Sequence, residues 1–313
     1  MNPRVFGFGS ATVDFRINTA EYGPGYVDKL LAQETRPLGG GSVANTLVQI
    51  ARLGGGATWF GKLGRDWIGD EIVRGLDEDG VDTSCVIRAD GVCSPFNVAV
   101  YADSWNRRIG GFLLPNALNT MTNADVSAFL PACSAGDWLI VEIGEVRLEL
   151  VQHLCTEARL FGVNVLIDVD LDPVKQCGAT EEVSRAILGM ADVLVPNRAS
   201  MRMLYGSPSA DDLVRDMAAE YEVPVVITAG DEGAWWCVPG DDPVQQMVYP
   251  AQAVDTVGAG DAFHGGFVFG LAQGWDMTRC VDIAARCGAA ACARRGARTS
   301  MPTREEIGMD LLD

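Results

Sequence analysis

The sequence has few histidines and no closely paired cysteines. Only His153 and His264 occur in 313 residues, and none of the nine cysteines belongs to a CxxC pair. A zinc site needs clustered Cys and His ligands, and a disulfide framework normally uses an even number of cysteines. The sequence therefore supports neither. We expect each cysteine to be a small buried hydrophobic residue in a protein of the reducing cytoplasm.

Long apolar runs and positive charges are also scarce. Runs such as Trp138–Val141 and Val223–Ile227 are far too short to cross a bilayer. The first residues enter an apolar segment with no cationic region ahead of it, which predicts a first strand and not a secretory signal. A net charge of −18 repels nucleic acid and anionic membranes, so we expect neither as a partner. Any bound nucleotide would need a local source of positive potential.

What the chain does contain is an alternation of short β-branched runs with longer amphipathic stretches, over a length sufficient for a large core. Several of the short runs are apolar on both faces, as in the buried strands of a parallel sheet. The alternation predicts an α/β fold, a mostly parallel sheet with helices on both faces. The expected strands are Val5–Phe8, Thr58–Lys62, Trp138–Glu142, Asn164–Asp168, Val193–Pro196 and Pro224–Thr228; the expected helices are Val43–Leu53, Trp67–Asp79, Leu148–Phe161, Glu181–Met190 and Ala210–Tyr221.

Two stretches interrupt this alternation. Residues 11–37 and 92–114 resemble short strands joined by turns, and Phe96–Tyr101 alternates apolar and polar residues. We interpret them as a small β-lid that projects from the main sheet. Neither has the composition of a linker, so residues 1–313 are expected to form a single domain.

The segment Asp255–Phe267, DTVGAGDAFHGGF, carries the clearest chemical signal. Gly258, Ala259 and Gly260 directly precede a helix-like run from Asp261 to Gln273. Small residues let backbone N–H groups converge on an anion, and the helix N-terminus adds partial positive charge. The carboxylate of Asp261 would then lie beside a transferred phosphoryl group, where it can accept the proton of an attacking hydroxyl.

A purely structural interpretation of Asp261 is that the helix dipole favours an acid in the first turn. The glycines at 265, 266 and 270 weigh against it. Each costs about 1 kcal/mol relative to alanine inside a helix, which implies close packing against the sheet or a ligand.

At this point the sequence resembles the ribokinase-like (PfkB) family of carbohydrate kinases. The segment above matches the family's second signature over its full length, and the first signature is also present. The resemblance extends from Val5 to Pro302 and rests on Asp255–Phe267, Gly39–Thr46 (GGGSVANT), Ala51–Gly54 and Gly61–Gly69.

The resemblance implies a ribokinase-like three-layer α/β/α sandwich with a small β-lid. It also implies ATP-dependent phosphorylation of a hydroxyl group on a sugar or sugar-like molecule. Asp261 would be the catalytic base, and the backbone amides of Gly258, Ala259 and Gly260 would form the anion hole. Asp14, Gly40, Gly41, Asn45 and Glu142 would contact the substrate.

For the nucleotide, Thr228, Gly230 and Gly233 are similar to the family's T-x-G-x-x-G turn, which lies beside ATP. Asn197 is similar to the Asn of the N-x-x-E motif associated with magnesium and phosphate. Here the sequence departs from the family, because position 200 is Ser.

The departure at Ser200 puts the usual metal–water network in doubt. Mg²⁺ can still arrive bound to ATP. As a hypothesis, Asp168 or Asp170 supplies the missing acid.

The resemblance further implies a monovalent cation, K⁺, held largely through carbonyl groups. Its ligands would be Asp255, Val257, Ala291, Gly296 and Ser300. His264 lies one turn beyond Asp261, and we interpret it as a helix-face histidine that contacts the neighbouring strand.

Alternative functions remain open. A nucleoside kinase of the adenosine type could stack a base on lid aromatics, although these equally suit packing of the lid or of a lid-to-lid homodimer. A sugar phosphate could use basic lid residues, and a catalytically weak regulatory protein could keep the fold. The aromatic residues are Phe15, Tyr26, Phe96, Tyr101 and Trp105; the basic residues are Arg16, Lys29, Arg107 and Arg108.

Overall fold

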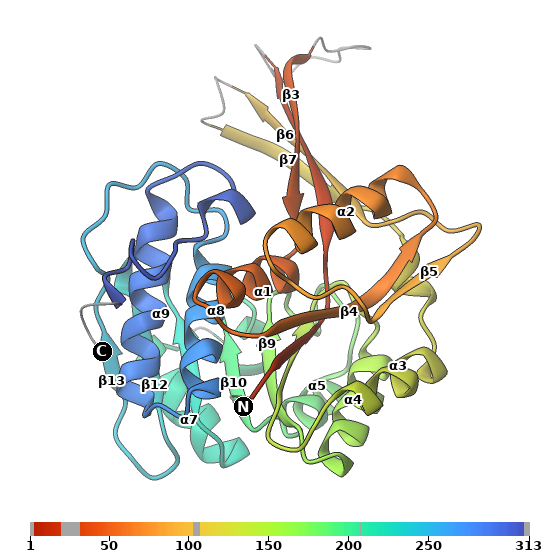
Figure 1. The fold of residues 1–313 in the computed structure, drawn as a ribbon. Helices are drawn as coiled ribbons and strands as arrows, with labels where there is room; N and C mark the ends of the chain where they lie inside the picture. The colour runs from red at the N-terminus through yellow and green to blue at the C-terminus, as the bar shows by residue number, and fades with distance from the viewer. Residues whose placement is uncertain (1–2, 20–31, 103–106, 207, 310–313) are drawn as a thin grey trace.

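The computed structural model describes residues 3–19, 32–102, 107–206 and 208–309. Figure 1 shows a broad sheet flanked by helices, with a smaller sheet projecting from one end. The large sheet has nine strands in the order β13-β12-β11-β10-β9-β8-β1-β4-β5. Its strands are β1 (Val5–Phe8), β4 (Ala57–Gly64), β5 (Val86–Ala89), β8 (Trp138–Ile143), β9 (Asn164–Val169), β10 (Val193–Pro196), β11 (Val225–Thr228), β12 (Ala234–Cys237) and β13 (Val244–Gln246).

All pairs from β11 to β5 are parallel, while β12 and β13 are added antiparallel at one edge. The six expected strands are therefore present, and the mostly parallel sheet is confirmed. The other three strands, β12 and β13 at this edge and β5 at the opposite edge, were not expected from the sequence.

The helices cover both faces of this sheet. The chain moves from β8 to β11 in one direction and from β1 to β5 in the other, so right-handed crossovers place the two sets of helices on opposite faces. The five expected helices and the helix expected to begin near Asp261 are present, whereas α3, α9 and the four-residue α6 (Arg202–Tyr205) are additional. The helices of eight residues or more, together with α3, are α1 (Ser42–Arg52), α2 (Trp67–Glu78), α3 (Asn123–Phe129), α4 (Leu148–Leu160), α5 (Glu181–Leu188), α7 (Ala210–Tyr221), α8 (Ala259–Ala272) and α9 (Met277–Cys292).

The reversal of direction falls between the neighbouring strands β1 and β8. Loops on the two sides of such a reversal diverge and leave a crevice at the carboxyl ends of the strands, where α/β proteins bind ligands. The segments after β1, β8 and β9 therefore surround the expected position of a site.

The smaller sheet begins at the same carboxyl ends of the main strands, because β2 follows β1. Its order is β3-β2-β6-β7, from β2 (Thr12–Thr19), β3 (Ala32–Gly40), β6 (Phe96–Ala102) and β7 (Arg107–Leu113). These strands fall in the two stretches expected to leave the main sheet, although β3 runs past residue 37. We call them the small sheet; its closure as a lid and its pairing in a homodimer stay predictions.

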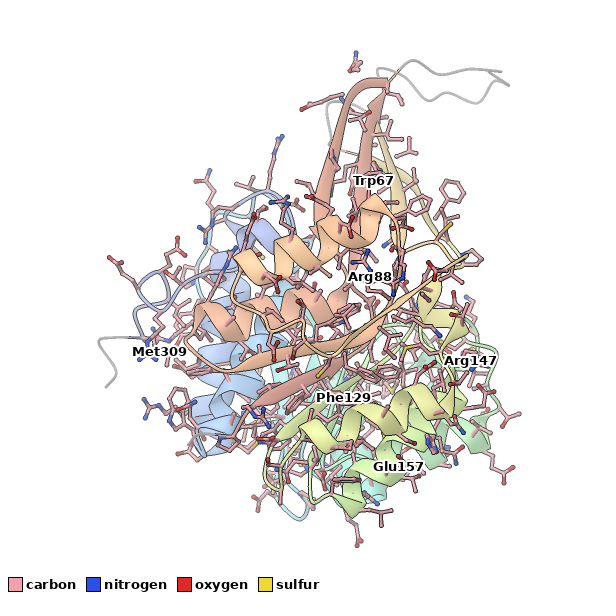
Figure 2. The ribbon with its side chains drawn as sticks, turned by 45° about the vertical axis from the view of Figure 1, so that its right-hand side comes forward. Trp67, Arg88, Phe129, Arg147, Glu157 and Met309 are labelled. Carbon is pink, nitrogen blue, oxygen red and sulfur yellow. The ribbon has the colours of Figure 1, made fainter. Side chains whose placement is uncertain are left out.

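Two aromatic residues of the small sheet, Phe15 and Phe96, are used in packing. The ring of Phe15 packs edge-on against Phe96, with centroids 6.0 Å apart, and against Trp67 at the start of α2, at 6.1 Å (Figure 2). Tyr26 and Trp105 lie outside the described residues, as does Lys29. Phe15 and Phe96 therefore contribute to the base of the small sheet, as the packing interpretation expects.

The core beneath the sheet is aromatic and closely packed. Phe129 of α3, labelled in Figure 2, stacks on Phe60 of β4 with ring centroids 4.1 Å apart and meets Phe6 edge-on. The fully buried Trp59 donates its indole N–H to the carbonyl oxygen of Gly9 at 3.2 Å. This bond ties β4 to the segment that leaves β1 for the site.

All nine cysteines are free. Five are buried, as expected, but Cys93 is exposed, so the expectation of burial is wrong there. Its position in the bend before β6 explains the difference, because that segment runs over the surface. Within the described ranges, no helix combines the length and apolar content needed to cross a membrane.

Gly41 fixes the turn from β3 into α1. Its φ is +92°, and a Cβ atom there would lie 2.5 Å from the carbonyl oxygen of Ser10. Gly54 has a similar φ of +86°, but a Cβ atom at that position would have nothing within 4 Å. Substitutions at both positions strain the backbone, but only a substitution at Gly41 also creates a steric clash.

We predict that Gly54→Ala lowers the free energy of unfolding by the cost of backbone strain alone, about 1–3 kcal/mol. Gly41→Ala should lose clearly more, because its methyl group must also displace the Ser10 backbone. Urea unfolding followed by circular dichroism measures both. Equal losses would contradict the close approach at Gly41.

Candidate active site

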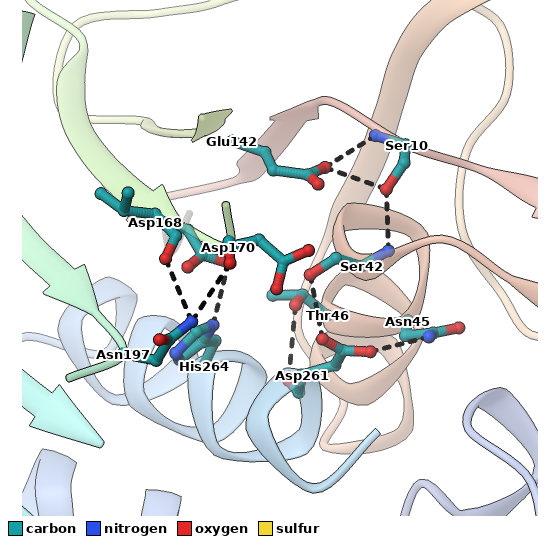
Figure 3. Close-up of polar contacts among 11 residues, drawn as sticks. Ser10, Ser42, Asn45, Thr46, Glu142, Asp168, Asp170, Asn197, Asp261 and His264 are labelled. Atoms are coloured by element: carbon teal, nitrogen blue, oxygen red, sulfur yellow. Dashed lines mark hydrogen bonds and ion pairs between the residues drawn. The ribbon is translucent and has the colours of Figure 1, made fainter. Parts of the chain in front are cut away.

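Asp261 lies in the first turn of α8, opposite the first turn of α1. Its Oδ1 accepts a hydrogen bond from the Ser42 hydroxyl at 2.9 Å, and its Oδ2 accepts one from Asn45 Nδ2 at 2.7 Å (Figure 3). Burial raises the pKa of Asp261 to about 7 against the lowering effect of Asn45, and the charge of Asp170 adds to the rise. A carboxylate poised near neutrality suits a general base. Ser42 was not singled out in the sequence, although it lies within the first motif.

The segment before Asp261 forms the turn that starts α8. Gly258 has a φ of +85°, and a Cβ atom there would lie 2.7 Å from Cα of Ala297. A Cβ atom at Gly260 would have nothing within 4 Å, so that face of the turn is open. The first N–H groups of a helix have no partner within it and can bind an anion. Here the amide of Ala259 donates to the carbonyl oxygen of Thr256 at 3.2 Å, so an anion would have to displace that bond.

The glycines inside α8 have a different role from the expected one. Added Cβ atoms at 265, 266 and 270 would lie 2.5–2.9 Å from Gln49, Cys287 and Cys280 respectively. These glycines allow α8 to pack closely between α1 and α9. Packing against the sheet or a ligand was the expectation, and the neighbours are instead two helices.

A cavity of about 650 Å³ adjoins the start of α8. Thr228, Gly230 and Gly233 line it, as do Ala259 and Gly260. The remaining lining is largely apolar and includes Tyr249, Pro250, Phe263 and Ala285. This volume and composition are typical of sites for small molecules and cofactors. The structure thus brings the predicted nucleotide turn, Thr228–Gly233, and the residues just before Asp261 to one cavity.

Gly233 is required by the sheet as well. Its φ is +87°, and a Cβ atom there would lie 2.1 Å from the carbonyl oxygen of Gln246 on β13. The close approach of the two edge strands therefore shapes this wall of the cavity.

Asn197 does not line that cavity. Its Nδ2 donates to the carbonyl oxygens of Val169 and Asp170, each at 3.3 Å, and its Oδ1 accepts from the Ser200 amide at 2.9 Å. It thereby fixes the end of β9. Ser200 is buried and donates its hydroxyl to the Asn197 carbonyl at 2.8 Å, so it offers no acid to the site.

Two carboxylates at the end of β9 stand near this position. Asp168 is buried and lies 3.0 Å from Nδ1 of His264, an ion pair when the histidine is protonated (Figure 3). Burial opposes protonation of His264, but the charge of Asp168 outweighs it and raises the histidine pKa. The expectation that His264 contacts the neighbouring strand is confirmed.

Asp170 follows Asp168 and points into the same crevice. Partial removal of water by the surrounding protein raises the pKa of Asp170 to about 6, and repulsion from the charge of Asp168 adds to the rise. The side chain nevertheless remains accessible to solvent. A carboxylate oxygen that solvent reaches is the kind of ligand that Mg²⁺ prefers. The part of the chain that the structure describes has no cluster of three or more residues arranged to hold a metal.

Asp14 lies on β2 of the small sheet. Its Oδ1 accepts from the Thr12 hydroxyl at 2.8 Å and from Asn97 Nδ2 at 3.2 Å. A Cβ atom at Gly40 would lie 2.3 Å from Oδ2 of Asp14, so only glycine lets β3 pass this carboxylate. The carbonyl oxygen of Gly40 accepts from the buried Arg298 at 2.7 Å, which holds the loop in place.

Glu142 is less accessible than the sequence suggested. Only 1% of it is exposed, and one carboxylate oxygen accepts both the amide and the hydroxyl of Ser10, each at 2.9 Å. Its role as a substrate contact stays a prediction.

Glu145, three residues further on, is a carboxylate that the sequence reasoning missed. It is half-buried, and among the described residues its carboxylate has no hydrogen-bond partner. Burial raises the pKa of Glu145 to about 7, and the charges of Asp14 and Asp170 contribute. The charges of both acids therefore act on Glu145. Its place just beyond a strand end was the available signal.

The five residues expected to hold a monovalent cation fall in two groups. In the first, the Asp255 carboxylate accepts the amides of Val257 and Gly296 at 3.1 and 3.0 Å. Arg16 of β2 also contacts this carboxylate, at 3.2 Å, and both side chains are largely buried. Arg16 thus links the small sheet to the loop before α8 and is not directed at a substrate phosphate.

In the second group, the carbonyl oxygens of Ala291 and Ser300 both accept hydrogen bonds from Arg294, each at 3.3 Å. The amide of Asp255 donates to the carbonyl of Cys292, next to Ala291, at 3.2 Å. Carboxylate and carbonyl oxygens are suitable ligands for a hard cation, so the donor set fits in kind. Potassium binding stays a prediction.

Comparison with known proteins adds an independent result. The sequence profile described as "pfkB family carbohydrate kinase" matches residues 2–304. The fructokinase of Escherichia coli is 30% identical, over 98% of this chain and 99% of its own length.

Two solved structures share the fold along nearly the whole chain. A ribokinase of Arabidopsis thaliana complexed with ribose and ATP superposes with a TM-score of 0.84 at 23% identity, covering 100% of this chain and 99% of its own. A fructokinase of Vibrio cholerae with fructose, ADP and potassium gives 0.79 at 22%, covering 98% of each chain. These likenesses confirm the ribokinase-like fold. The chain belongs to the pfkB family of carbohydrate kinases.

Proposed function

We propose that this protein transfers the γ-phosphoryl group of ATP to a hydroxyl group of an uncharged sugar or polyol. The observation that carries the proposal is the position of Asp261. Its carboxylate is held by two donors of α1 and lies next to the helix turn Gly258–Gly260, of which Ala259 and Gly260 line the large cavity. A base and an anion-binding turn side by side are what phosphoryl transfer to an alcohol requires.

The substrate would lie between the small sheet and Asp261. The charges of Asp14 and Asp170 act on Glu145, and the charge of Asp170 acts on Asp261. We therefore infer that these carboxylates line the substrate path. Carboxylates accept hydrogen bonds from hydroxyl groups, and several along one path suit a molecule with several hydroxyls. Asp14, Gly40, Gly41 and Asn45 keep their proposed roles as substrate contacts.

In the reaction, Asp261 takes the proton of the substrate hydroxyl while the oxygen of that hydroxyl bonds to the γ-phosphorus. The bond from that phosphorus to the bridging oxygen of ADP breaks, and the backbone amides of Gly258, Ala259 and Gly260 stabilise charge on the transferring group. Closure of the small sheet would exclude water and limit hydrolysis of ATP. Positioning and electrostatics would supply most of the rate acceleration.

Magnesium would enter with ATP and neutralise phosphate charge. Asp170 would contact it or its water molecules, because Ser200 has no acid to offer. Asp168 is already committed to His264 and is less suited to this role.

A substrate panel tests the class of acceptor. Ribose, fructose, inositol, 2-keto-3-deoxygluconate and adenosine, each in a coupled ADP assay, separate neutral polyols from an acid and a nucleoside. We expect ribose, fructose or inositol to be phosphorylated, because the described acids lining the path repel anions. Turnover of 2-keto-3-deoxygluconate or adenosine alone would overturn the proposed class.

We predict that Asp261→Asn lowers kcat by about 100-fold or more, a typical loss for a general base. An amide cannot take the hydroxyl proton. Circular dichroism and nucleotide affinity should stay close to the parent, because the change is isosteric. Near-normal turnover of a folded variant would refute the assignment.

We predict that Glu145→Gln raises KM for the sugar about tenfold or more with little change in kcat, since a charged hydrogen-bond acceptor is weakened. Glu149→Gln, on the exposed side of α4, is the matched control and should behave like the parent. Steady-state kinetics with varied sugar make the comparison. Identical KM values for both variants would remove Glu145 from the substrate path.

The last prediction concerns the expected potassium ion. If a cation joins the Asp255 carboxylate and the neighbouring carbonyl groups, kcat/KM should rise when K⁺ replaces tetramethylammonium at constant ionic strength. The chosen reference cation is too large for a site of this kind. Full activity without potassium would discard the site, and Arg16 would then be the positive partner of Asp255.

A further inference from the structure

A polar path runs from the buried interior to Asp261 through two serines. One carboxylate oxygen of Glu142 accepts the amide and the hydroxyl of Ser10, and Ser10 Oγ accepts the amide of Ser42 at 2.9 Å (Figure 3). The hydroxyl of Ser42 then donates to Asp261 at 2.9 Å. The path crosses from β8 to the end of β1, to α1 and to α8.

The first serine acts as a helix cap from another segment. The residue before α1 is Gly41, which has no side chain to cap the helix. Ser10 takes over this role, because its hydroxyl accepts the Ser42 amide and its carbonyl accepts the Ala44 amide at 3.0 Å. Two of the orphan N–H groups of α1 are thereby satisfied.

Glu142 fixes the orientation of the Ser10 hydroxyl. A hydroxyl group has a single hydrogen to donate, and Ser10 donates it to Glu142 at 2.9 Å. The lone pairs of Ser10 Oγ therefore face Ser42. With only 1% of its surface exposed, Glu142 is placed to order this junction.

Ser42 and Asn45 occupy the first turn of α1, and each holds one oxygen of Asp261. Because the start of α1 is fixed by Ser10, both donors are presented at set positions. The Ser42 hydroxyl donates its one hydrogen to Asp261, so it stabilises the ionised form of that carboxylate.

We propose that Ser42 is a positioning residue for Asp261, kept in place by Ser10 and Glu142, and that it holds the carboxylate ionised and aimed for proton transfer. This inference rests on the proposed role of Asp261 as base. Ser42 does not touch the reacting atoms in this arrangement.

The charged groups around Asp261 set the expected direction of the effect. Asp170, at the end of β9, disfavours the ionised form, while His264 on α8, paired with Asp168, favours it when protonated. Removing the Ser42 donor leaves the repulsion from Asp170 in place. Asp261 would then hold its proton to higher pH, so activity would be lost on the acid side first.

The test compares Ser42→Ala with Ser42→Thr over pH 5.5–9.5. For Ser42→Ala we expect kcat/KM to fall about tenfold or more at the acid end, in line with loss of a hydrogen bond to a charged group, and to recover toward the parent at the alkaline end. Ser42→Thr, which keeps the hydroxyl, should restore the parental profile. KM for ATP should change little in both.

An unshifted acid limb in a folded Ser42→Ala variant would overturn the proposal, as would an equal loss at every pH. Ser10→Ala tests the cap and should move the limb in the same direction; an unmoved limb would remove Ser10 and Glu142 from the account. The Asp261→Asn variant distinguishes failure of the proposed function from failure of this inference. If it keeps turnover, the proposed function fails, whereas an inactive Asp261→Asn with an unshifted Ser42→Ala refutes only this inference.

Discussion

The meeting of two helix N-termini at one carboxylate is the interaction on which the site depends. The first turn of α1 supplies Ser42 and Asn45, and the start of α8 supplies Asp261 and a backbone that is open at Gly260. In a chain with a net charge of −18, such helix ends are a local source of positive potential for a phosphate group. They also give a buried carboxylate the hydrogen-bond donors that it needs.

The crowding of acids in the crevice follows from the topology. Strands β1, β8 and β9 are neighbours, and their carboxyl ends bring Glu142, Glu145, Asp168 and Asp170 to the edge from which the small sheet carries Asp14. Burial and mutual repulsion raise the pKa values of Glu145 to about 7 and of Asp170 to about 6. Such shifted values cluster at functional sites, where bound ligands can compensate the charge. A cation that arrives with ATP and a substrate rich in hydroxyl groups would both do so.

The sequence predicted the main sheet well because its central strands are apolar on both faces and its helices are amphipathic. It did not predict the three short strands at the edges, namely β5 and the antiparallel strands β12 and β13. Motif spacing located Asp261 and the glycines of both cavity walls. It could not show that Glu142 is buried against Ser10, or that the charges of Asp14 and Asp170 raise the pKa of the half-buried Glu145, because position near a strand end does not reveal burial. The contact of Arg16 with Asp255, 239 positions apart, was likewise beyond pattern reasoning.

The central claim is that Asp261 works as a base whose pKa is near 7 because it is buried. The pH dependence of kcat/KM for the unaltered protein, at saturating Mg²⁺ and ATP, measures this most directly. The base must be ionised to accept a proton, so activity should rise with pH through an acid limb centred near 7. An acid limb near 4, the ordinary value for an aspartate, or a flat profile between pH 5 and 8 would contradict the account.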